Sequence, residues 1–252
     1  MHSMEKEDRN EFVDLEAYLI PETRILLAEI NSQLPHPKEV LLRKVYNSEE
    51  PWQVRKCVSY HIDMPAKDEG NIVFFTHELL HIYFDFCQGM KIHDLELIHL
   101  VAPYGNAYPE QPWYLPNHFI TLINHLQHHK MVPYYAAYNF PLDKIIVNFE
   151  NPVDLLETFD KNLKTAFDLE QPAHRYTAAL GYVNFLTLEL YFPNPAVRKE
   201  LRNKYSLQYD KKFVGLRSIF QPVLEKWNTE YYDLRQLIFD INDKATEYAK
   251  MD

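Results

Sequence analysis

The chain has 252 residues, of which 46% are hydrophobic and 14% aromatic, and a formal net charge of −10. This composition predicts a folded globular protein with one substantial core, and the presence of only 5 glycines argues against long flexible linkers. The acidic balance argues against nucleic acid as a partner, because phosphate binding needs a basic surface. Cys57 and Cys87 are the only cysteines and form no C-x-x-C pair, which excludes a disulfide framework and a cysteine-rich zinc site.

Neither a secretory signal nor a membrane span is expected. The first ten residues are charged and lack an apolar segment, and no run of about 18 apolar residues occurs along the chain. We therefore expect a cytoplasmic protein with no membrane partner.

Proline and glycine divide the first half of the chain into segments. Pro21 can open a helix at its first turn, whereas Pro35 and Pro133 are expected to end the helices that precede them. Gly89 suits the left-handed turn that follows a helix. The elements expected in chain order are a helical region at 11–34, strands at 41–46 and 57–64, a helix at 72–88, an irregular excursion at 90–112 and a helix at 116–131.

After Pro141 the pattern of apolar residues is almost wholly helical. The predicted fold class is therefore α+β and predominantly α. A small amino-terminal part, residues 1–140, holds a few strands and two central helices, and a helical part follows at 141–252, although the two could form one continuous domain. The helices expected in the second part are 152–169, 172–191, 195–205, 212–226 and 229–249.

The segment His77-Glu78-Leu79-Leu80-His81 carries the clearest chemical signal. On a helix, histidines four residues apart lie one turn apart on the same face, where both imidazoles can bind one tetrahedral zinc ion. Glu78 then lies near the metal, where its carboxylate can take a proton from a water molecule as general base. The five-residue pattern alone is weak evidence, because it also arises by chance in sequences rich in His and Glu.

The surrounding helix strengthens this interpretation. At about 100° per residue, His77, Glu78, His81 and Asp85 fall on one narrow strip. The other positions from 72 to 87 are mostly apolar, which predicts a helix buried almost all round. Ionisable groups on the strip must then be paired, neutral or bound to a metal. A buried hydrogen-bond network, or a strip that faces solvent, is the alternative.

The third ligand is expected further along the chain, because a catalytic zinc ion commonly takes three protein ligands and leaves one position for water. On the helix expected at 116–131, polar residues recur on one side and end at His128, which we predict as the third ligand. Asn124, one turn earlier, is predicted to orient the His128 ring.

Three other residues remain candidates at the site. His125 is an alternative third ligand, although it lies on a flank typical of surface histidines. Glu96 is a second alternative, in a polar stretch that could equally be a solvated turn. Asp85, one turn after His81, could bind the metal, but we expect it to hydrogen-bond a ligand histidine or the backbone, which would fix the imidazole tautomer.

Two segments resemble a known family. Thr76-His77-Glu78-Leu79-Leu80-His81-Ile82-Tyr83 resembles the active-site helix of the zincin metallopeptidases. Asn124-His125-Leu126-Gln127-His128 is similar to the downstream ligand helix of gluzincin-like members, bacterial proteins of this kind among them. The resemblance covers residues 57–135 and implies zinc binding by both motif histidines and a general-base role for Glu78. The Gly-x-x-His extension of metzincins and the downstream Asn-Glu pair of thermolysin-type enzymes are both absent.

These features together predict a zinc-dependent hydrolase, in which residues 1–140 bind the metal and cleave amide bonds of a peptide or protein substrate. Tyr134 or Tyr135 could stabilise the oxyanion, although packing is the simpler role for either. Two other classes of protein remain open. One is a catalytically inactive zincin-like regulatory or protein-binding module, and the other is a helical interaction protein in which the motif is accidental.

Overall fold

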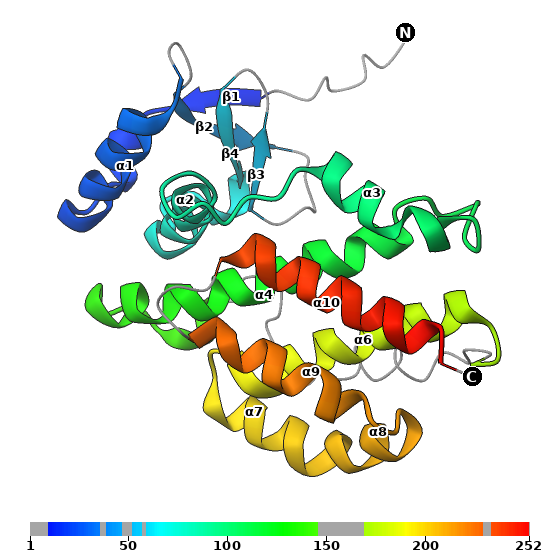
Figure 1. Cartoon of the computed structure of the whole chain (residues 1–252). Helices are drawn as coiled ribbons and strands as arrows, with labels where there is room; N and C mark the ends of the chain where they lie inside the picture. Colours follow the sequence, from blue (N-terminus) through cyan, green and yellow to red (C-terminus); the bar gives the residue numbers. More distant parts are fainter. Residues whose placement is uncertain are drawn as a thin grey trace, which may run out of the picture. The chain divides into compact units, whose positions relative to one another are not determined.

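The fold is built from helices and one small sheet (Figure 1). The prediction of an α+β, predominantly α fold is therefore confirmed. No described helix is long and apolar enough to cross a membrane. Almost all of the helix predicted at 152–169 lies outside the described residues. The computed structural model describes residues 10–35, 39–46, 52–56, 59–145, 169–228 and 233–251.

The chain divides into two compact units that interleave along the sequence. The first comprises Met1–Gly89 and Met131–Asn148, and the second comprises Met90–Lys130 and Phe149–Asp252. The domain boundary predicted between residues 140 and 141 falls inside the second segment of the first unit. As a statement about domains, it stays a prediction.

A four-stranded sheet lies in the first unit, in the order β1-β2-β4-β3. The central strands β2 and β4 run parallel, and β1 and β3 pair antiparallel at the two edges. The strands predicted at 41–46 and 57–64 are confirmed as β2 and β4 where the chain is described. The strand bounds are β1 (Asn10–Val13), β2 (Val40–Val45), β3 (Gln53–Lys56) and β4 (Tyr60–Pro65).

The beginning of the chain corrects one prediction. Residues 11–34 do not form one helical region, because β1 comes first, the 3-10 turn η1 (Leu15–Tyr18) follows, and helix α1 (Pro21–Gln33) begins only at its proline. The backbone of β1 pairs with that of β2, and pairing within a sheet overrides the weak local preference of a short segment.

Helix α2 (Ile72–Phe86) is the central helix of the first unit and packs against α1, β3 and β4. Asn71 caps its first turn, where the side-chain oxygen accepts a hydrogen bond from the Phe74 amide at 3.1 Å. Gly89 follows α2 with a φ of 64°, the left-handed conformation that suits the end of a helix. The helix predicted at 72–88 is confirmed.

Helix α4 (Tyr114–Ala137) contributes to both units, because a unit boundary falls within it. The helix predicted at 116–131 is confirmed, but the stop expected before Pro133 is wrong, since α4 continues for another turn. A proline inside a helix removes one backbone hydrogen bond. Met131 and Tyr135, on either side of it, are both fully buried, and we attribute the continued helix to the free energy of burying them.

The described part of the second unit is helical, with α6 in contact with α3, α7, α9 and α10. The helix predicted at 172–191 is confirmed as α6. The remaining bounds are α3 (Asp94–Gly105), α6 (Pro172–Tyr191), α7 (Pro195–Leu201), the π-helix η4 (Arg202–Ser206), α8 (Leu207–Lys212), α9 (Leu216–Glu225) and α10 (Leu234–Ala249), with short 3-10 turns η2 (Ala66–Asp68), η3 (Leu142–Lys144) and η5 (Lys226–Asn228) elsewhere in the chain.

Two boundaries in this unit differ from the prediction. The stretch 90–112 is less irregular than expected, because α3 occupies its middle. The helix predicted at 212–226 is two helices, α8 and α9, and Gly215 between them has a φ of 86°. Only glycine adopts that conformation without strain, so the chain breaks there.

Candidate metal centre

The sequence of α2 places two histidines on the buried side of an almost wholly apolar helix. His77 and Glu78 are 3% and 6% exposed, and Leu79 and Leu80 beside them are fully buried. His81 is half-buried one turn later. The first half of the strip predicted from the sequence therefore lies in the interior, where uncompensated polar groups are costly, and its second half is half-buried.

The two motif histidines are in direct contact. His77 Nε2 lies 3.0 Å from His81 Nε2, and the ring centroids are 4.7 Å apart with an interplanar angle of 78°. Burial, followed by the neighbouring His81, lowers the pKa of His77 well below its usual value. His77 is therefore neutral near pH 7, the form in which an imidazole nitrogen can bind a metal ion.

His128, from α4, completes the cluster. One ligand nitrogen from each of His77, His81 and His128 lies within 4.8 Å of the other two, and these three residues could hold a metal ion. His128 is 4% exposed. The structure thus brings together the three histidines that the sequence nominated as ligands, from helices separated by α3.

The spacing of these nitrogens fits a single small ion. A tetrahedral zinc ion with zinc–nitrogen distances of about 2.0–2.1 Å places its ligand nitrogens about 3.3 Å apart. The two motif nitrogens, at 3.0 Å, already match this separation. The ligand nitrogens of all three histidines lie within 4.8 Å of one another, a spacing that a single ion can bridge after small side-chain adjustments.

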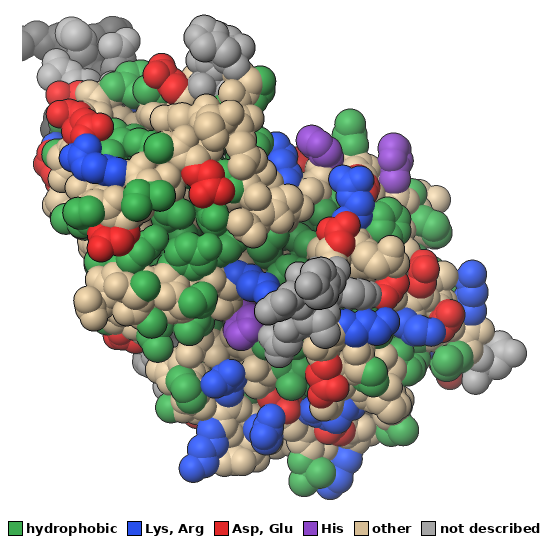
Figure 2. Space-filling view, turned by 60° about the vertical axis from the view of Figure 1, so that its left-hand side comes forward, with side chains coloured by type: hydrophobic (Ala, Val, Ile, Leu, Met, Phe, Trp, Pro, Cys, Tyr) green, Lys and Arg blue, Asp and Glu red, His purple; other side chains and the backbone are tan. Residues whose placement is uncertain are grey.

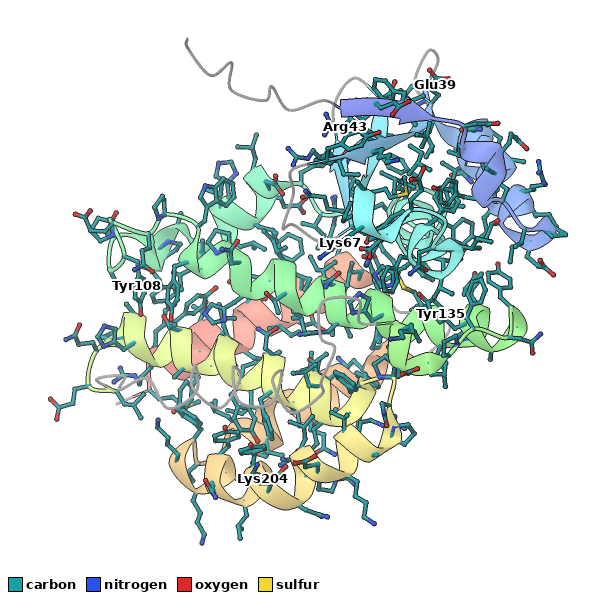
Figure 3. The ribbon with its side chains drawn as sticks, turned by 180° about the vertical axis from the view of Figure 1, so that it is seen from behind. Glu39, Arg43, Lys67, Tyr108, Tyr135 and Lys204 are labelled. Carbon is teal, nitrogen blue, oxygen red and sulfur yellow. The ribbon has the colours of Figure 1, made fainter. Side chains whose placement is uncertain are left out.

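Tyr135, which Figure 3 labels on α4, contacts His77 through the ring nitrogen that does not face His81. Its hydroxyl oxygen lies 3.3 Å from His77 Nδ1, and its side chain is fully buried. Sequence reasoning offered Tyr135 as an oxyanion group or a packing residue and missed this contact. The signal was present, however, because residues seven apart on a helix share a face, and Tyr135 follows His128 by that spacing.

Glu78 supplies an acidic group next to the histidines. Burial raises the pKa of its carboxyl to about 8. The charge of Glu78, after burial itself, also raises the pKa of Tyr135. Glu78 therefore lies in the same buried cluster as His77 and Tyr135, where a bound cation would favour its carboxylate form.

Two other predicted residues lie on α4 near His128. Asn124, expected to orient His128, has an exposed side chain. His125 is half-buried, its ring centroid is 6.4 Å from that of His128, and burial lowers its pKa to about 4. His125 is absent from the group of described residues whose ligand atoms could share one ion.

The predicted acidic candidates lie in different surroundings. Glu96, on α3, forms an ion pair with Arg235 at 3.1 Å and is not in the histidine cluster. Asp85 lies one turn after His81, and its charge adds to the effect of burial in raising the pKa of Tyr60. Neither carboxylate joins the three histidines as a ligand group among the described residues.

Tyr134 points elsewhere. Its ring packs against Tyr83 and Phe84, with centroid distances of 6.0 and 5.6 Å. Burial and a hydrogen bond with Tyr83 raise its pKa. These contacts support the packing role that the sequence analysis considered simpler for this residue.

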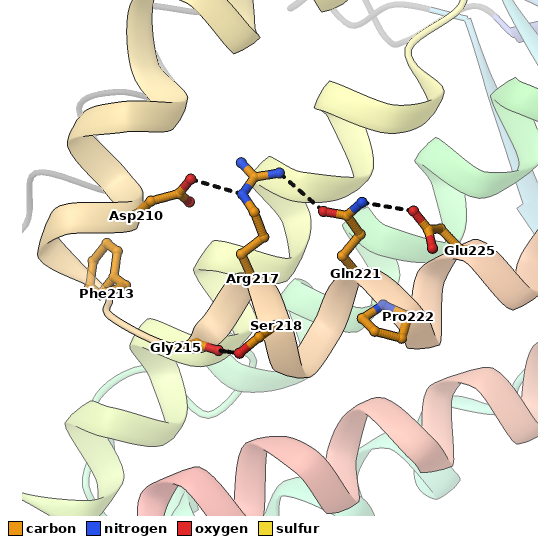
Figure 4. A pocket seen from close by; sticks show the side chains of 8 residues that line it. All are labelled: Asp210, Phe213, Gly215, Arg217, Ser218, Gln221, Pro222 and Glu225. Carbon is orange, nitrogen blue, oxygen red and sulfur yellow. Dashed lines mark hydrogen bonds and ion pairs between the residues drawn. The ribbon is translucent and has the colours of Figure 1, made fainter.

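A shallow surface pocket lies in the second unit and contains none of the three histidines (Figure 4). Its lining includes Asp210, Arg217, Gln221 and Glu225, which are linked in a row by hydrogen bonds and an ion pair. The row satisfies its own polar groups, so we assign it to stability rather than to the metal centre.

Comparison of the chain with known protein families, with curated proteins and with solved structures found no match. The metal centre therefore rests on the residues themselves and on their geometry.

Proposed function

We propose that this protein is a zinc-dependent hydrolase that cleaves amide bonds in peptides or proteins. His77, His81 and His128 would hold the zinc ion, and Glu78 would act as the general base. The observation that carries the proposal is the convergence of three imidazole nitrogens within 4.8 Å, beside a buried carboxyl group.

The donor set favours zinc over other common ions. Magnesium and calcium prefer oxygen ligands, whereas imidazole nitrogens suit zinc and other transition metals. Three histidine ligands with a fourth position left for water are also typical of catalytic rather than structural zinc sites. A structural site is usually closed by four protein ligands.

Glu78 is suited to proton transfer by its place next to His77. When bound, zinc supplies a Lewis acid that polarises the scissile carbonyl and makes water nucleophilic near neutral pH. Glu78 would accept a proton from the attacking water and pass it to the leaving amine. A buried, ionised carboxylate would also offset part of the positive charge that three neutral ligands leave uncompensated.

One observation favours a second candidate, a zincin-like regulatory or protein-binding module without turnover. His77, Glu78 and His128 are at most 6% exposed, and only His81 is half-buried. A peptide bond must reach the metal to be cleaved, whereas a module that uses zinc for stability needs no open approach. Both candidates bind zinc, but only the hydrolase needs the Glu78 carboxylate.

The substitution Glu78→Gln separates the two candidates. We expect the variant to retain zinc, because its three histidines are unchanged, and to hydrolyse peptides about 10²–10⁴-fold more slowly, the usual contribution of a general base. The measurement is cleavage of a mixed peptide library by zinc-loaded protein, followed by mass spectrometry. Glu96→Gln, which alters a carboxylate paired with Arg235 outside the cluster, is the matched control.

The outcomes are distinct. Cleavage by the wild-type protein and by Glu96→Gln, but not by Glu78→Gln, supports the hydrolase. Zinc-loaded wild-type protein that cleaves no peptide contradicts the hydrolase and leaves the regulatory module. Cleavage that persists in Glu78→Gln contradicts the role given to Glu78.

A further inference from the structure

The buried hydroxyl of Tyr135 lies against the nitrogen of His77 that does not face the cluster. Its oxygen is 3.3 Å from His77 Nδ1, whereas His77 Nε2 is the atom that approaches His81. The ring of Phe140 packs against Tyr135 at a centroid distance of 5.7 Å. The hydroxyl group is therefore held in the interior beside His77.

The contact with Tyr135 affects metal binding through the position of the proton on the His77 ring. A neutral imidazole carries one proton, and the nitrogen without it supplies the lone pair for a metal. If His77 binds through Nε2, the proton must lie on Nδ1. That N–H group then points at the Tyr135 oxygen, which can accept a hydrogen bond.

We infer that Tyr135 is a positioning residue of the metal centre, which accepts a hydrogen bond from His77 Nδ1 and so keeps the Nε2 lone pair of His77 available to zinc. The inference rests on the proposed zinc site but does not require that the site turns over a substrate. Partners of this kind, on the far side of a ligand histidine, typically change metal affinity by 10–100-fold.

Burial explains why His77 in particular needs an internal acceptor. His77 is 3% exposed, so its Nδ1–H cannot rely on bulk water, and a buried donor that loses its partner bears the full cost of desolvation. The hydroxyl of Tyr135 supplies such an acceptor at 3.3 Å.

The placement of Tyr135 also couples the two helices that carry the site. His128 and Tyr135 lie on the same face of α4, seven residues apart, and α4 is continuous between them. One helix therefore supplies both a ligand and the partner of another ligand. The hydrogen bond to His77 helps to hold that face of α4 toward α2.

The test is the zinc affinity of Tyr135→Phe, which removes the hydroxyl group and keeps the ring. The zinc dissociation constant, measured by competition with a chromophoric chelator, should be 10–100-fold higher than that of the wild-type chain. Tyr134→Phe is the matched control, because the adjacent tyrosine packs against Tyr83 and Phe84. Its zinc affinity should equal that of the wild type.

A second readout separates positioning from simple loss of structure. In the zinc-loaded wild-type protein, the imidazole N–H proton of His77 should give a nuclear magnetic resonance signal that is protected from exchange. In Tyr135→Phe this signal should shift and exchange faster. Circular dichroism of both variants without metal should show the helical content of the wild type.

The outcomes distinguish this inference from the proposed function. Wild-type protein that binds no zinc overturns the metal centre, and the role of Tyr135 falls with it. Zinc binding by the wild type, with equal affinity in Tyr135→Phe, overturns only the role of Tyr135. An equal loss of affinity in Tyr134→Phe also overturns it, because the effect would then not depend on the hydroxyl group beside His77.

Discussion

His118 is a half-buried histidine outside the candidate metal centre. It lies on α4 within the second unit, with its ring 5.3 Å from that of Tyr114 at an angle of 78°. Its Nε2 atom is buried without a hydrogen-bond partner among the described residues. Burial lowers its pKa from 6.5 to about 4, so the fold holds this side chain in its neutral form.

We predict that His118 makes the protein sensitive to mild acid. The unfolded chain takes up a proton at this residue below pH 6.5, whereas the folded chain resists protonation until about pH 4. The stability that follows from the neutral form is complete above pH 6.5 and is lost as the pH falls toward 4. The loss should be on the order of 1–3 kcal/mol, by the free energy of a pKa shift.

Urea-induced unfolding of metal-free protein at several pH values between 4 and 7 measures this effect. His118→Gln should reduce, but not abolish, the dependence of the unfolding free energy on pH, because burial also lowers the pKa values of His77 and His125. His99→Gln, which changes an exposed histidine on α3, should leave the slope as in the wild type. An unchanged slope in His118→Gln would show that other groups control the acid response.

Some residue-level features of the metal site were predictable from the sequence and others were not. The spacing of His77 and His81 fixes their relation, because both lie on one helix. The polar side of its helix was enough to nominate His128, but the distance of His128 from His77 and His81 depends on how the two helices pack, which no local pattern encodes. The contact of Tyr135 with His77 follows from that packing, together with the continuation of α4 past Pro133 that the sequence rule for proline excluded.

At the scale of elements, an ion-pair network around the buried carboxylate of Glu189 links α6, α8 and α9. Arg217 makes two hydrogen bonds with Glu189, at 2.8 and 3.2 Å, and one with Asp210 at 2.8 Å. The Glu189 side chain is only 3% exposed. Ser206, at the end of the π-helix η4, donates a further hydrogen bond to Glu189, so the carboxylate is well compensated.

We predict that Arg217→Ala lowers the free energy of unfolding by about 3 kcal/mol, because it leaves a buried carboxylate short of its main cation. Chemical denaturation measures the change. Arg217→Ala combined with Glu189→Gln should recover part of the loss, since the uncompensated charge is gone. Lys211→Ala, at an exposed position of α8, should change the stability by about 0.5 kcal/mol or less.

Two results would contradict this role of Arg217 and Glu189. A stability of Arg217→Ala equal to that of the wild type would show that the network contributes little. A double variant less stable than the single one would show that Glu189 is held by other groups. Sequence reasoning could not foresee the network, because its partners come from three helices and a break at Gly215 that only the structure reveals.

At the scale of the whole molecule, the chain interleaves its two compact units, and α4 contributes to both. Hydrophobic periodicity identified the helices α2, α4 and α6 and the two central strands, because amphipathic patterns are local. It could not show that residues 131–148 belong with the amino-terminal unit. The association of residues 131–148 with the amino-terminal unit depends on long-range contacts such as the one between Tyr135 and His77.

The surface charge argues against nucleic acid as a partner but does not identify the substrate. The chain carries a net charge of −10, and on the face drawn in Figure 2 basic side chains are interspersed with acidic ones. That face offers no continuous basic surface of the kind that nucleic acid requires. The expectation of a peptide or protein substrate stays a prediction.

Zinc binding should raise the free energy of unfolding, because the proposed ligands come from α2 and α4 and lie close together only in the folded chain. At a free zinc concentration one hundred times the dissociation constant, a ligand that binds only the folded state adds about 2.7 kcal/mol. For a chain of this size, this corresponds to a rise of roughly 5–10 °C in the midpoint of thermal unfolding. Differential scanning calorimetry with zinc, and then with excess chelator, should show the rise and its reversal.

The most direct test of the metal centre is the zinc content of the purified chain and its histidine variants, measured by elemental analysis after dialysis against a zinc buffer. The account predicts one zinc ion per wild-type chain, one per chain in His99→Ala, and a loss of bound zinc in His77→Ala and in His128→Ala. Wild-type protein without stoichiometric zinc, or zinc content unchanged by His77→Ala and His128→Ala, would contradict it.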